Sequence, residues 1–278
     1  MKVLILGATG LLGQALMREW SGDEVVGLGV DDVDIRNAEK VREIIEKTRP
    51  EWIVLAAAYT DVDGCESNQE LAFSVNRDGA VLVARAAKNA GAKVLFLSSD
   101  YVFDGNKTSP YEIGDARNPQ SIYGRSKAEA EIQLLEVIPT CCIVRTAWLF
   151  GSGGKCFPDT ILKLAATRPA LDVVSDQRGC PTYSVDLART IIQLCRKNAQ
   201  GIVHVTNAGE CSWFEFASEI VKRSGFSTEV RPVSTQQMAR PAPRPAYSVM
   251  SAKSLLDNGI VVPTWHDALG RYLQERSG

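Results

Sequence analysis

The sequence has no apolar run of the roughly 18 to 20 residues that a membrane-spanning helix requires. Its formal net charge of −2 at pH 7 offers no broad attraction to nucleic acid or to an anionic membrane surface. The first residues, MKVLILGATG, reach glycine too soon to form a signal peptide and contain no small-residue cleavage site. From these absences we expect a cytoplasmic protein that binds neither nucleic acid nor membrane.

Residues that bind metals are also few. The chain has two histidines, His204 and His266, and seven cysteines with no Cys-x-x-Cys pair among them. Because zinc sites are built from clustered cysteines and histidines, the sequence predicts no metal site. The odd number of cysteines indicates reduced thiols rather than a disulfide framework.

Short apolar runs alternate with longer amphipathic stretches through the first half of the chain. Continuous apolar strands separated by helices are typical of a parallel sheet covered on both faces. We therefore predict the α/β class, with a doubly wound, Rossmann-like parallel sheet. The predicted strands are residues 2–6, 24–28, 52–58, 93–98 and 141–147, and the predicted helices are residues 11–20, 38–47 with Asn37 as its cap, and about 71–89.

The alternation loosens after Trp148. The stretch GSGGKCF (residues 151–157) is predicted to be a flexible loop, and residues 201–207 are predicted to be a strand that rejoins the sheet. Ser212 begins a capping-box pattern that opens another helix. The loosened pattern predicts a smaller C-terminal region beside the main sheet.

A glycine-rich stretch, GATGLLG, follows the first predicted strand and opens the first predicted helix. Gly7 permits a tight turn, Gly10 lets the backbone approach a diphosphate, and Gly13 permits close packing of helix on strand. The helix N-terminus adds free N–H groups and the positive end of a dipole. The spacing differs from the usual Gly-x-Gly-x-x-Gly, and such turns also occur without ligands, but its place in a doubly wound pattern favours a dinucleotide site.

The end of the second predicted strand normally discriminates NAD from NADP. An acidic residue there binds the ribose 2′-hydroxyl of NAD, whereas an arginine favours the 2′-phosphate of NADP. Gly29 and Val30 stand at this point, with Asp31 and Asp32 slightly later and Arg36 later still. A solvated acidic turn and a ribose contact fit the pattern equally well, so the sequence leaves NADPH or NADH open.

Tyr123 and Lys127 are four residues apart and would share one face of a helix. A nearby ammonium favours phenolate, so Lys127 is expected to lower the pKa of Tyr123 and help it protonate a carbonyl oxygen that receives hydride at carbon. This spacing alone usually marks an ordinary helix surface. Ser99, however, ends the fourth predicted strand, where parallel sheets bind ligands, and could hydrogen-bond that carbonyl. The glycine loop, the serine and the Tyr–Lys pair in this order favour a reductase site over a plain strand-end turn.

With these motifs the chain resembles the extended short-chain dehydrogenase/reductases, and most closely the dTDP-4-dehydrorhamnose reductase family. The resemblance covers nearly the whole chain, and the last three of its motifs are the most specific. It rests on GATGLLG (7–13), AAAYTDVD (56–63), SSDYVFDG (98–105), YGRSK (123–127), RTAWLFG (145–151), DQRGCPT (176–182) and RPAYS (244–248).

The resemblance implies roles for individual residues. The catalytic residues would be Ser99, which stands where the family often has Thr, with Tyr123 and Lys127. The cofactor-binding residues would be Gly7, Gly10, Leu11, Leu12, Gly13, Asp34, Ile35, Ala58, Tyr59, Thr60, Tyr123 and Lys127. The substrate-binding residues would be Thr60, Ser99, Asp100, Trp148, Arg178 and Arg244.

The resemblance also implies a division of the chain. Residues 1–150 plus about 183–206 would form the NAD(P)-binding domain, and residues 151–182 plus 207–278 would bind a sugar nucleotide. Core packing for Trp148, and a turn or salt bridges for Arg178 and Arg244, remain as alternatives to ligand contacts.

The implied activity is NAD(P)H-dependent reduction of the 4-keto group of a nucleotide-linked 6-deoxysugar. The best single candidate is conversion of dTDP-4-dehydro-L-rhamnose to dTDP-L-rhamnose, by a protein that could form a homodimer. One alternative is another nucleotide-sugar reductase or epimerase, although Asp100 is the only clear candidate for the extra acid–base residue that an epimerase needs. The other is a non-catalytic NAD(P)-binding subunit like the regulatory subunit of methionine adenosyltransferase.

Overall fold

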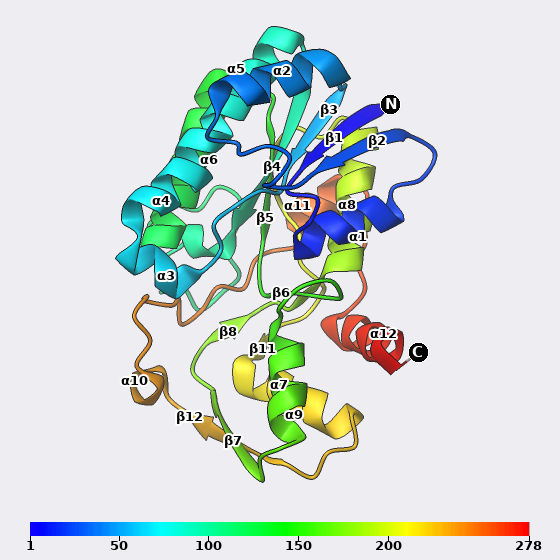
Figure 1. Ribbon diagram of the computed structural model, residues 1–278. Helices are drawn as coiled ribbons and strands as arrows, with labels where there is room; N and C mark the ends of the chain where they lie inside the picture. The colour runs from blue at the N-terminus through cyan, green and yellow to red at the C-terminus, as the bar shows by residue number, and fades with distance from the viewer. Residues whose placement is uncertain (278) are drawn as a thin grey trace.

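A six-stranded, fully parallel sheet forms the upper half of the molecule in Figure 1. The computed structural model describes residues 1–277. The predicted fold class, a doubly wound α/β protein, is confirmed. In the order β10-β5-β4-β3-β1-β2, the strands are β10 (Gly201–His204), β5 (Cys142–Thr146), β4 (Lys93–Ser99), β3 (Trp52–Leu55), β1 (Lys2–Leu6) and β2 (Glu24–Leu28).

The central strands are apolar throughout because both faces of the sheet are covered. In β1, Val3 and Ile5 belong to one hydrophobic cluster and Leu4 and Leu6 to another, as the alternation of side chains along a strand requires. The first cluster is covered by α1 (Leu11–Glu19) and α8 (Ser184–Arg196). The second is covered by α2 (Ala38–Thr48), α5 (Ala80–Ala90) and α6 (Ile122–Val137).

The connection from β3 to β4 differs in detail from the single helix predicted over residues 71–89. It consists of α3 (Val62–Ser67), α4 (Gln69–Phe73), a π-helical stretch at Ser74–Gly79, and α5. Insertions of this kind are frequent at functional sites. The stretch contains Asn76, whose side chain is buried.

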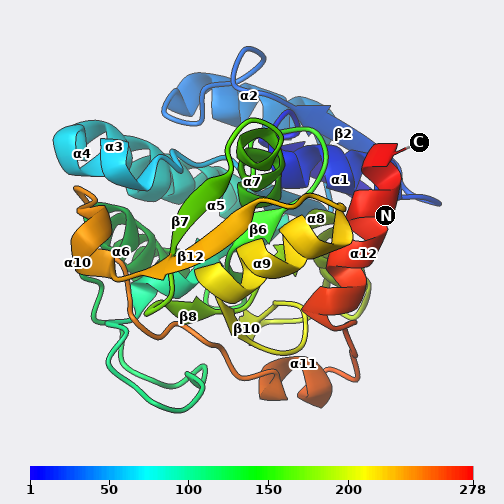
Figure 2. The same cartoon turned by 90° about the horizontal axis from the view of Figure 1, so that it is seen from below.

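A smaller unit with its own aromatic core lies below the sheet. Its parallel pair, β7 (Ala170–Val174) and β12 (Glu229–Val233), is visible from below in Figure 2, beside α7 (Phe157–Ala165) and α9 (Trp213–Arg223). The core of this unit includes Phe150 and Phe216. Four two-residue strands form two further pairs, β6 (Leu149–Phe150) with β9 (Thr182–Tyr183) and β8 (Arg178–Gly179) with β11 (Cys211–Ser212).

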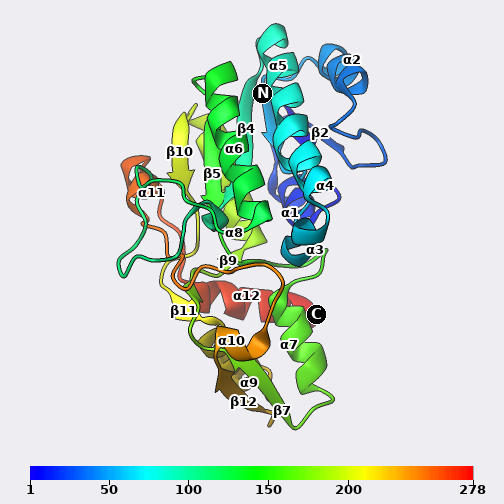
Figure 3. The same cartoon turned by 90° about the vertical axis from the view of Figure 1, so that its left-hand side faces the viewer.

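The C-terminal segment packs against both the main sheet and the lower unit. Figure 3 shows α12 (Trp265–Ser277) between the main sheet and the lower unit, with α10 (Thr235–Met238) and α11 (Lys253–Asp257) in the preceding segment. Leu255 and Ile260 pack into the cluster beside α1 and α8, whereas Trp265 and Leu269 pack into the aromatic core. The division of the chain into two domains therefore stays a prediction, since residues 255–272 contribute to both cores.

Several local features agree with the sequence. The Asn37 side chain accepts a hydrogen bond from the Lys40 N–H at the start of α2, and Ser212 and Glu215 form the predicted capping box. All seven cysteines are free and buried. None of the helices within residues 1–277 combines the length and apolar character that crossing a bilayer requires.

Candidate functional site

A cavity of about 390 Å³ opens at the carboxyl ends of β1, β3, β4 and β5, the edge where parallel sheets bind ligands. It brings together twelve residues that the sequence predicts to be functional. These are Gly7, Gly10, Leu11, Leu12, Gly13, Ala58, Thr60, Ser99, Asp100, Tyr123, Lys127 and Trp148.

The glycine loop has the close packing that a diphosphate cradle needs. Gly7 has φ +94°, and a Cβ at Gly13 would lie 2.1 Å from the Gly7 carbonyl oxygen. A Cβ at Gly10 would meet nothing closer than 3.4 Å, so this glycine borders open space. Helix α1 begins after Gly10 with no side-chain cap and no acidic residue in its first turn. The free N–H groups and the dipole therefore face the cavity, and they fit the diphosphate of a dinucleotide.

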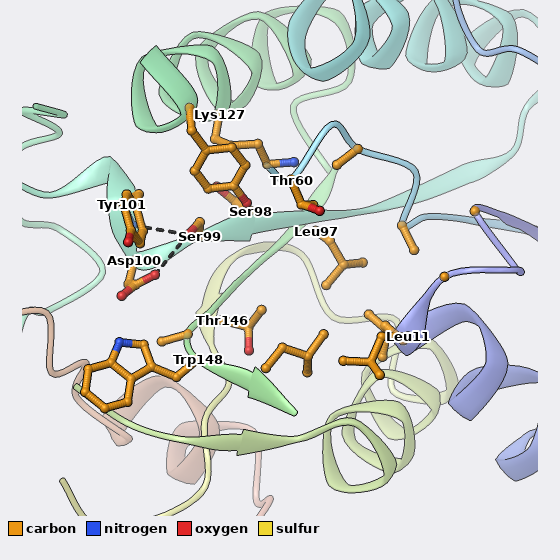
Figure 4. Close-up of a pocket in the computed structure, with 18 of the residues that line it drawn as sticks. Leu11, Thr60, Leu97, Ser98, Ser99, Asp100, Tyr101, Lys127, Thr146 and Trp148 are labelled. Carbon is orange, nitrogen blue, oxygen red and sulfur yellow. Dashed lines mark hydrogen bonds between the residues drawn. The ribbon is translucent and has the colours of Figure 1, made fainter. Parts of the chain in front are cut away.

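Ser99 is fixed by its own strand end. Its hydroxyl donates to Asp100 Oδ1 at 2.9 Å and accepts the Tyr101 N–H at 3.2 Å, as the dashed lines in Figure 4 show. These bonds hold the hydroxyl at the point where β4 gives way to the single 3₁₀ turn Asp100–Val102. Ser99 is thus oriented before any ligand arrives.

Tyr123 and Lys127 both reach the cavity from α6. Lys127 is only 2% exposed, and its ammonium lies 4.0 Å from the centroid of the Phe96 ring. Burial lowers the pKa of Lys127 to about 7, although the charge of Glu131 opposes this change. Lys127 therefore titrates near physiological pH.

Burial acts on Tyr123 in the opposite direction. It raises the pKa of the Tyr123 phenol well above its usual range, and the neighbouring Ser99 hydroxyl offsets part of this rise. The prediction that Lys127 lowers the pKa of Tyr123 is therefore wrong at this site, because desolvation outweighs any effect of the ammonium. Tyr123 therefore carries its proton throughout the physiological range, and the raised pKa makes it a weaker acid than a free tyrosine.

Asp100 is the acidic group of the cavity. It is 2% exposed, and burial raises its pKa to about 6, although the nearby Ser248 and Ser99 hydroxyls oppose this change. Its Oδ2 has no hydrogen-bond partner at ordinary bonding distance within residues 1–277. A buried oxygen without a partner is costly, so it is expected to receive one from a ligand. The Thr146 hydroxyl, also in the cavity lining, is in the same situation.

Asn76 holds the loop that carries Ala58, Tyr59 and Thr60. Its Oδ1 accepts the Tyr59 N–H at 2.8 Å, and its Nδ2 donates to the Tyr59 carbonyl and to Ser126 Oγ on α6, both at 3.0 Å. One side chain thus couples this loop to the helix of Tyr123 and Lys127. Sequence reasoning missed Asn76, because nothing near it in the chain indicates that it bridges two distant segments.

Five of the predicted residues do not line the cavity: Tyr59, in the loop held by Asn76, and Asp34, Ile35, Arg178 and Arg244. Asp34 forms a bidentate ion pair with Arg36 beside a shallow surface pocket, and Ile35 is buried against Gly79. Their contact with an adenine stays a prediction.

Arg178 and Arg244, which are predicted to bind substrate, are paired with acids outside the main cavity. Arg178 pairs with Glu210 at 2.9 Å and Glu215 at 3.2 Å, and Arg244 pairs with Asp63 at 2.9 and 3.0 Å. A substrate contact would require these pairs to open, and it stays a prediction.

Other residues of the cavity lining were not among the predicted site residues. Lys155, from the loop after β6, is exposed and makes no ion pair or side-chain hydrogen bond with residues 1–277. Its loop lies directly on the glycine loop, because the Gln14 amide donates to the Gly153 carbonyl at 2.6 Å and to the Thr9 carbonyl at 2.8 Å. The remaining residues are Ala56, Val62, Leu97, Ser98, Tyr101, Thr146, Ala147 and Leu149.

A buried charge cluster lies behind the cavity. Glu131, one turn after Lys127, accepts hydrogen bonds from Ser98, Arg145 and Arg117. Glu131 and Arg145 are completely buried. The cluster ties α6 to β4 and β5, and so fixes the spacing between Ser99 and the Tyr–Lys pair.

Comparison with known proteins agrees with this geometry. A family model described as the RmlD substrate binding domain matches residues 1–277. The chain belongs to this family. It is 42% identical to the spore coat polysaccharide biosynthesis protein SpsK of Bacillus subtilis, over 99% of this chain and 98% of that protein. It is 37% identical to a dTDP-4-dehydrorhamnose reductase of Mycobacterium tuberculosis, over 98% and 92% of the two chains.

Solved structures of the RmlD family show the same fold. A dTDP-4-dehydrorhamnose reductase from Clostridium acetobutylicum aligns with a TM-score of 0.98 and 39% identity over 100% of both chains. A dTDP-4-dehydrorhamnose reductase from Bacillus anthracis, solved in complex with NADP, aligns with a TM-score of 0.96 and 38% identity over 99% of both chains. The predicted family is confirmed.

Proposed function

We propose that this protein reduces the 4-keto group of a nucleotide-linked 6-deoxysugar with NADPH or NADH, and that its substrate is dTDP-4-dehydro-L-rhamnose. The observation that carries the proposal is the single cavity in which Ser99, Tyr123 and Lys127 meet the glycine loop. Relatives that are 36–39% identical, with most of their length aligned, are named dTDP-4-dehydrorhamnose reductases.

The residues of the cavity divide the chemistry among them. A bound nicotinamide cofactor supplies hydride to the carbonyl carbon. Ser99, already oriented by Asp100 and Tyr101, hydrogen-bonds the carbonyl oxygen. Tyr123 gives its proton to that oxygen as negative charge develops, so that the product is a neutral hydroxyl.

Lys127 and Asp100 complete the assignment. The Lys127 ammonium would contact the nicotinamide ribose. Asp100 Oδ2 accepts a hydrogen bond from a sugar hydroxyl, which satisfies an otherwise unpaired buried atom. Trp148 supplies an apolar wall for the deoxysugar.

The proposal includes the division of labour between the two parts of the chain. Residues 1–150 and about 183–206 hold the cofactor, and the remaining segments bind the sugar nucleotide. Asp34 and Ile35 lie near the adenine, and Arg178 and Arg244 contact the substrate. A cytoplasmic location and a homodimer are also part of it.

The alternative functions are less well supported. A non-catalytic cofactor-binding subunit does not need the complete set of Ser99, Tyr123 and Lys127. An epimerase or dehydratase needs a further acid–base pair, and Asp100 is followed by Tyr101 rather than by a glutamate.

The deciding experiment is a panel of dTDP-, GDP- and UDP-linked 4-keto-6-deoxysugars, each with NADPH and NADH, with nicotinamide absorbance as the rate and NMR for product stereochemistry. We expect turnover with dTDP-4-dehydro-L-rhamnose and formation of dTDP-L-rhamnose. Turnover only with a GDP- or UDP-linked sugar would contradict the nucleotide assignment and keep the reductase class. Cofactor binding without turnover of any sugar would favour the non-catalytic subunit.

A further inference from the structure

Trp148 stands in an unusual backbone conformation. Its φ is +46°, in the left-handed region that bulky side chains rarely occupy. Such residues persist only where their surroundings impose the conformation, and they cluster at functional sites. Trp148 lies between β5 and β6 and lines the cavity. Figure 4 shows its indole across the cavity from Lys127 and below Asp100.

Trp213 is the main partner of this indole. The two rings stack with centroids 3.5 Å apart and planes 8° from parallel. Phe157 lies against Trp213, with ring centroids 4.5 Å apart. Trp148 therefore packs against Trp213, and Trp213 itself packs against Phe157 and the aromatic core.

Gly179 provides the space beside the indole. A Cβ at this position would lie 2.5 Å from Trp148 Cε2, closer than any side chain can come without displacement. The φ of Gly179 does not fall in the left-handed region, so glycine is needed here for room and not for backbone conformation. The Trp148 carbonyl meanwhile accepts the Thr182 N–H at 3.2 Å.

Gly179 and Trp213, the two neighbours of the Trp148 indole, are positioned by one short antiparallel strand pair. Gly179 in β8 pairs with Cys211 in β11, and Arg178 pairs with Ser212. Ser212 is also the cap of α9, whose first residue is Trp213, and the capping box with Glu215 fixes the start of that helix. The same backbone pairing therefore sets the positions of Gly179 and Trp213 relative to each other.

We propose that Trp213 is a positioning residue that, with Gly179, holds Trp148 in its left-handed conformation, so that the indole forms the wall against which the 6-deoxysugar packs. The inference rests on the proposed function for the identity of the ligand. Neither Trp213 nor Gly179 lines the cavity, so both act through Trp148. Sugar affinity is expected to depend on them, and cofactor affinity is not.

The test compares Trp213→Ala, Trp213→Phe and Gly179→Ala with Phe214→Ala as control. Phe214 is the next residue of α9 and is also partly buried, but makes no ring contact with Trp148. The measurements are KM and kcat for the keto sugar, the Kd of NADPH, and the near-ultraviolet circular dichroism of the stacked indoles. The circular dichroism reports on the Trp148–Trp213 pair without any turnover.

We expect Trp213→Ala and Gly179→Ala to raise KM for the keto sugar by about tenfold or more, the scale of a lost apolar contact, with kcat and NADPH affinity nearly unchanged. Trp213→Phe should keep a stacking ring and restore most of the sugar affinity. Phe214→Ala should leave both KM and the dichroism of the indole pair as in the wild type. If Trp213→Ala fails to fold, Trp213→Phe and Gly179→Ala still provide the comparison.

Two outcomes distinguish a failure of this inference from a failure of the proposed function. Wild-type turnover together with an unchanged KM in both Trp213→Ala and Gly179→Ala would overturn the positioning role and keep the reductase. A wild-type protein that neither binds nor reduces any sugar nucleotide would overturn both. An equal rise in KM for Phe214→Ala would show a general weakening of α9 and would also overturn the specific role of Trp213.

Discussion

The two sides of the cavity are built in different ways. On the sheet side, Ser99 stands at the end of a seven-residue strand, and Tyr123 and Lys127 stand on a sixteen-residue helix. Ser99 and Lys127 are buried. On the opposite side, Trp148 lies between a strand and a two-residue strand, in a left-handed conformation. Lys155 follows in an exposed loop.

This difference matches the proposed division between residues that carry the reaction and residues that recognise the sugar. A proton donor must keep its place to within a fraction of an ångström, and long regular elements provide that accuracy. A wall that selects one sugar can be changed by substitutions in short connecting segments without disturbing the sheet. The following predictions test this division, beginning with the largest expected effect.

The largest effect is expected on the sheet side, at Tyr123. Tyr123→Phe removes the proposed proton donor and keeps the ring, so turnover should fall by about 10² to 10⁴-fold while NADPH affinity changes little. Steady-state kinetics at saturating substrate and fluorescence titration of NADPH measure the two effects. The control is Tyr247→Phe, which loses a hydroxyl that pairs with Glu210 outside the cavity. A Tyr123→Phe enzyme with more than about a third of wild-type rate, while chemistry is rate-limiting, would exclude Tyr123 as the acid.

The second effect concerns the glycine loop. Gly13→Ala places a Cβ 2.1 Å from the Gly7 carbonyl, so α1 must shift away from the loop. We expect a loss of about 1–3 kcal/mol in the free energy of unfolding and a marked loss of NADPH affinity. Gly114→Ala is the control, because a Cβ there meets nothing within 4 Å. Denaturant titration and NADPH binding that are unchanged in Gly13→Ala would show that the loop tolerates repacking.

The third effect is a pH dependence carried by Lys127. Its pKa is lowered to about 7 by burial, so above pH 7 the side chain loses its proton and must regain one to attract an anionic cofactor. NADPH affinity should therefore fall as pH rises from 7 to 9, by at most about tenfold per pH unit. Lys127→Met should bind NADPH more weakly at pH 7 and with a flatter profile. A wild-type profile as flat as that of the variant would contradict a titrating Lys127.

The smallest effect is expected across the cavity, at Lys155. Lys155 is the cationic residue of the loop that contacts the glycine loop. A single exposed charge near a diphosphate contributes modestly to the binding free energy, and salt screens its effect. We expect Lys155→Met to weaken NADPH binding by about threefold to tenfold at low salt, and by less at high salt. Lys163→Met, an exposed lysine on α7, should have no effect. A loss at Lys155 as large as that at Lys127 would break the proposed contrast between the two sides.

The sequence predicts the sheet side well because its signals are local. The glycine loop, Ser99 and the Tyr–Lys pair each appear as short motifs whose spacing follows from helix and strand geometry. The strand pattern likewise predicts the doubly wound sheet, since continuous apolar runs mean burial on both faces. What spacing cannot supply is burial depth, and the predicted direction of the Tyr123 pKa is wrong for that reason.

The other side depends on contacts between distant segments. Trp213 meets Trp148 across 65 positions of sequence, and nothing near either residue indicates the stack. Asn76 and Glu131 are similar, because each connects elements that only the folded sheet brings together. Patterns in a single sequence indicate which face of a helix or strand is buried and where the element ends. They do not indicate which loops pack against one another.

The seven buried cysteines can serve as probes of local opening of the folded protein. Burial raises the pKa of Cys65 to about 11 and that of Cys142 to about 12, so a thiol reagent finds almost no thiolate at these two positions in the folded chain. Cys142 lies in the core beneath the sheet side, and Cys156 and Cys211 lie in the aromatic core behind Trp148. The order in which these thiols are modified over time therefore reports which half of the molecule opens first and exposes its interior to solvent.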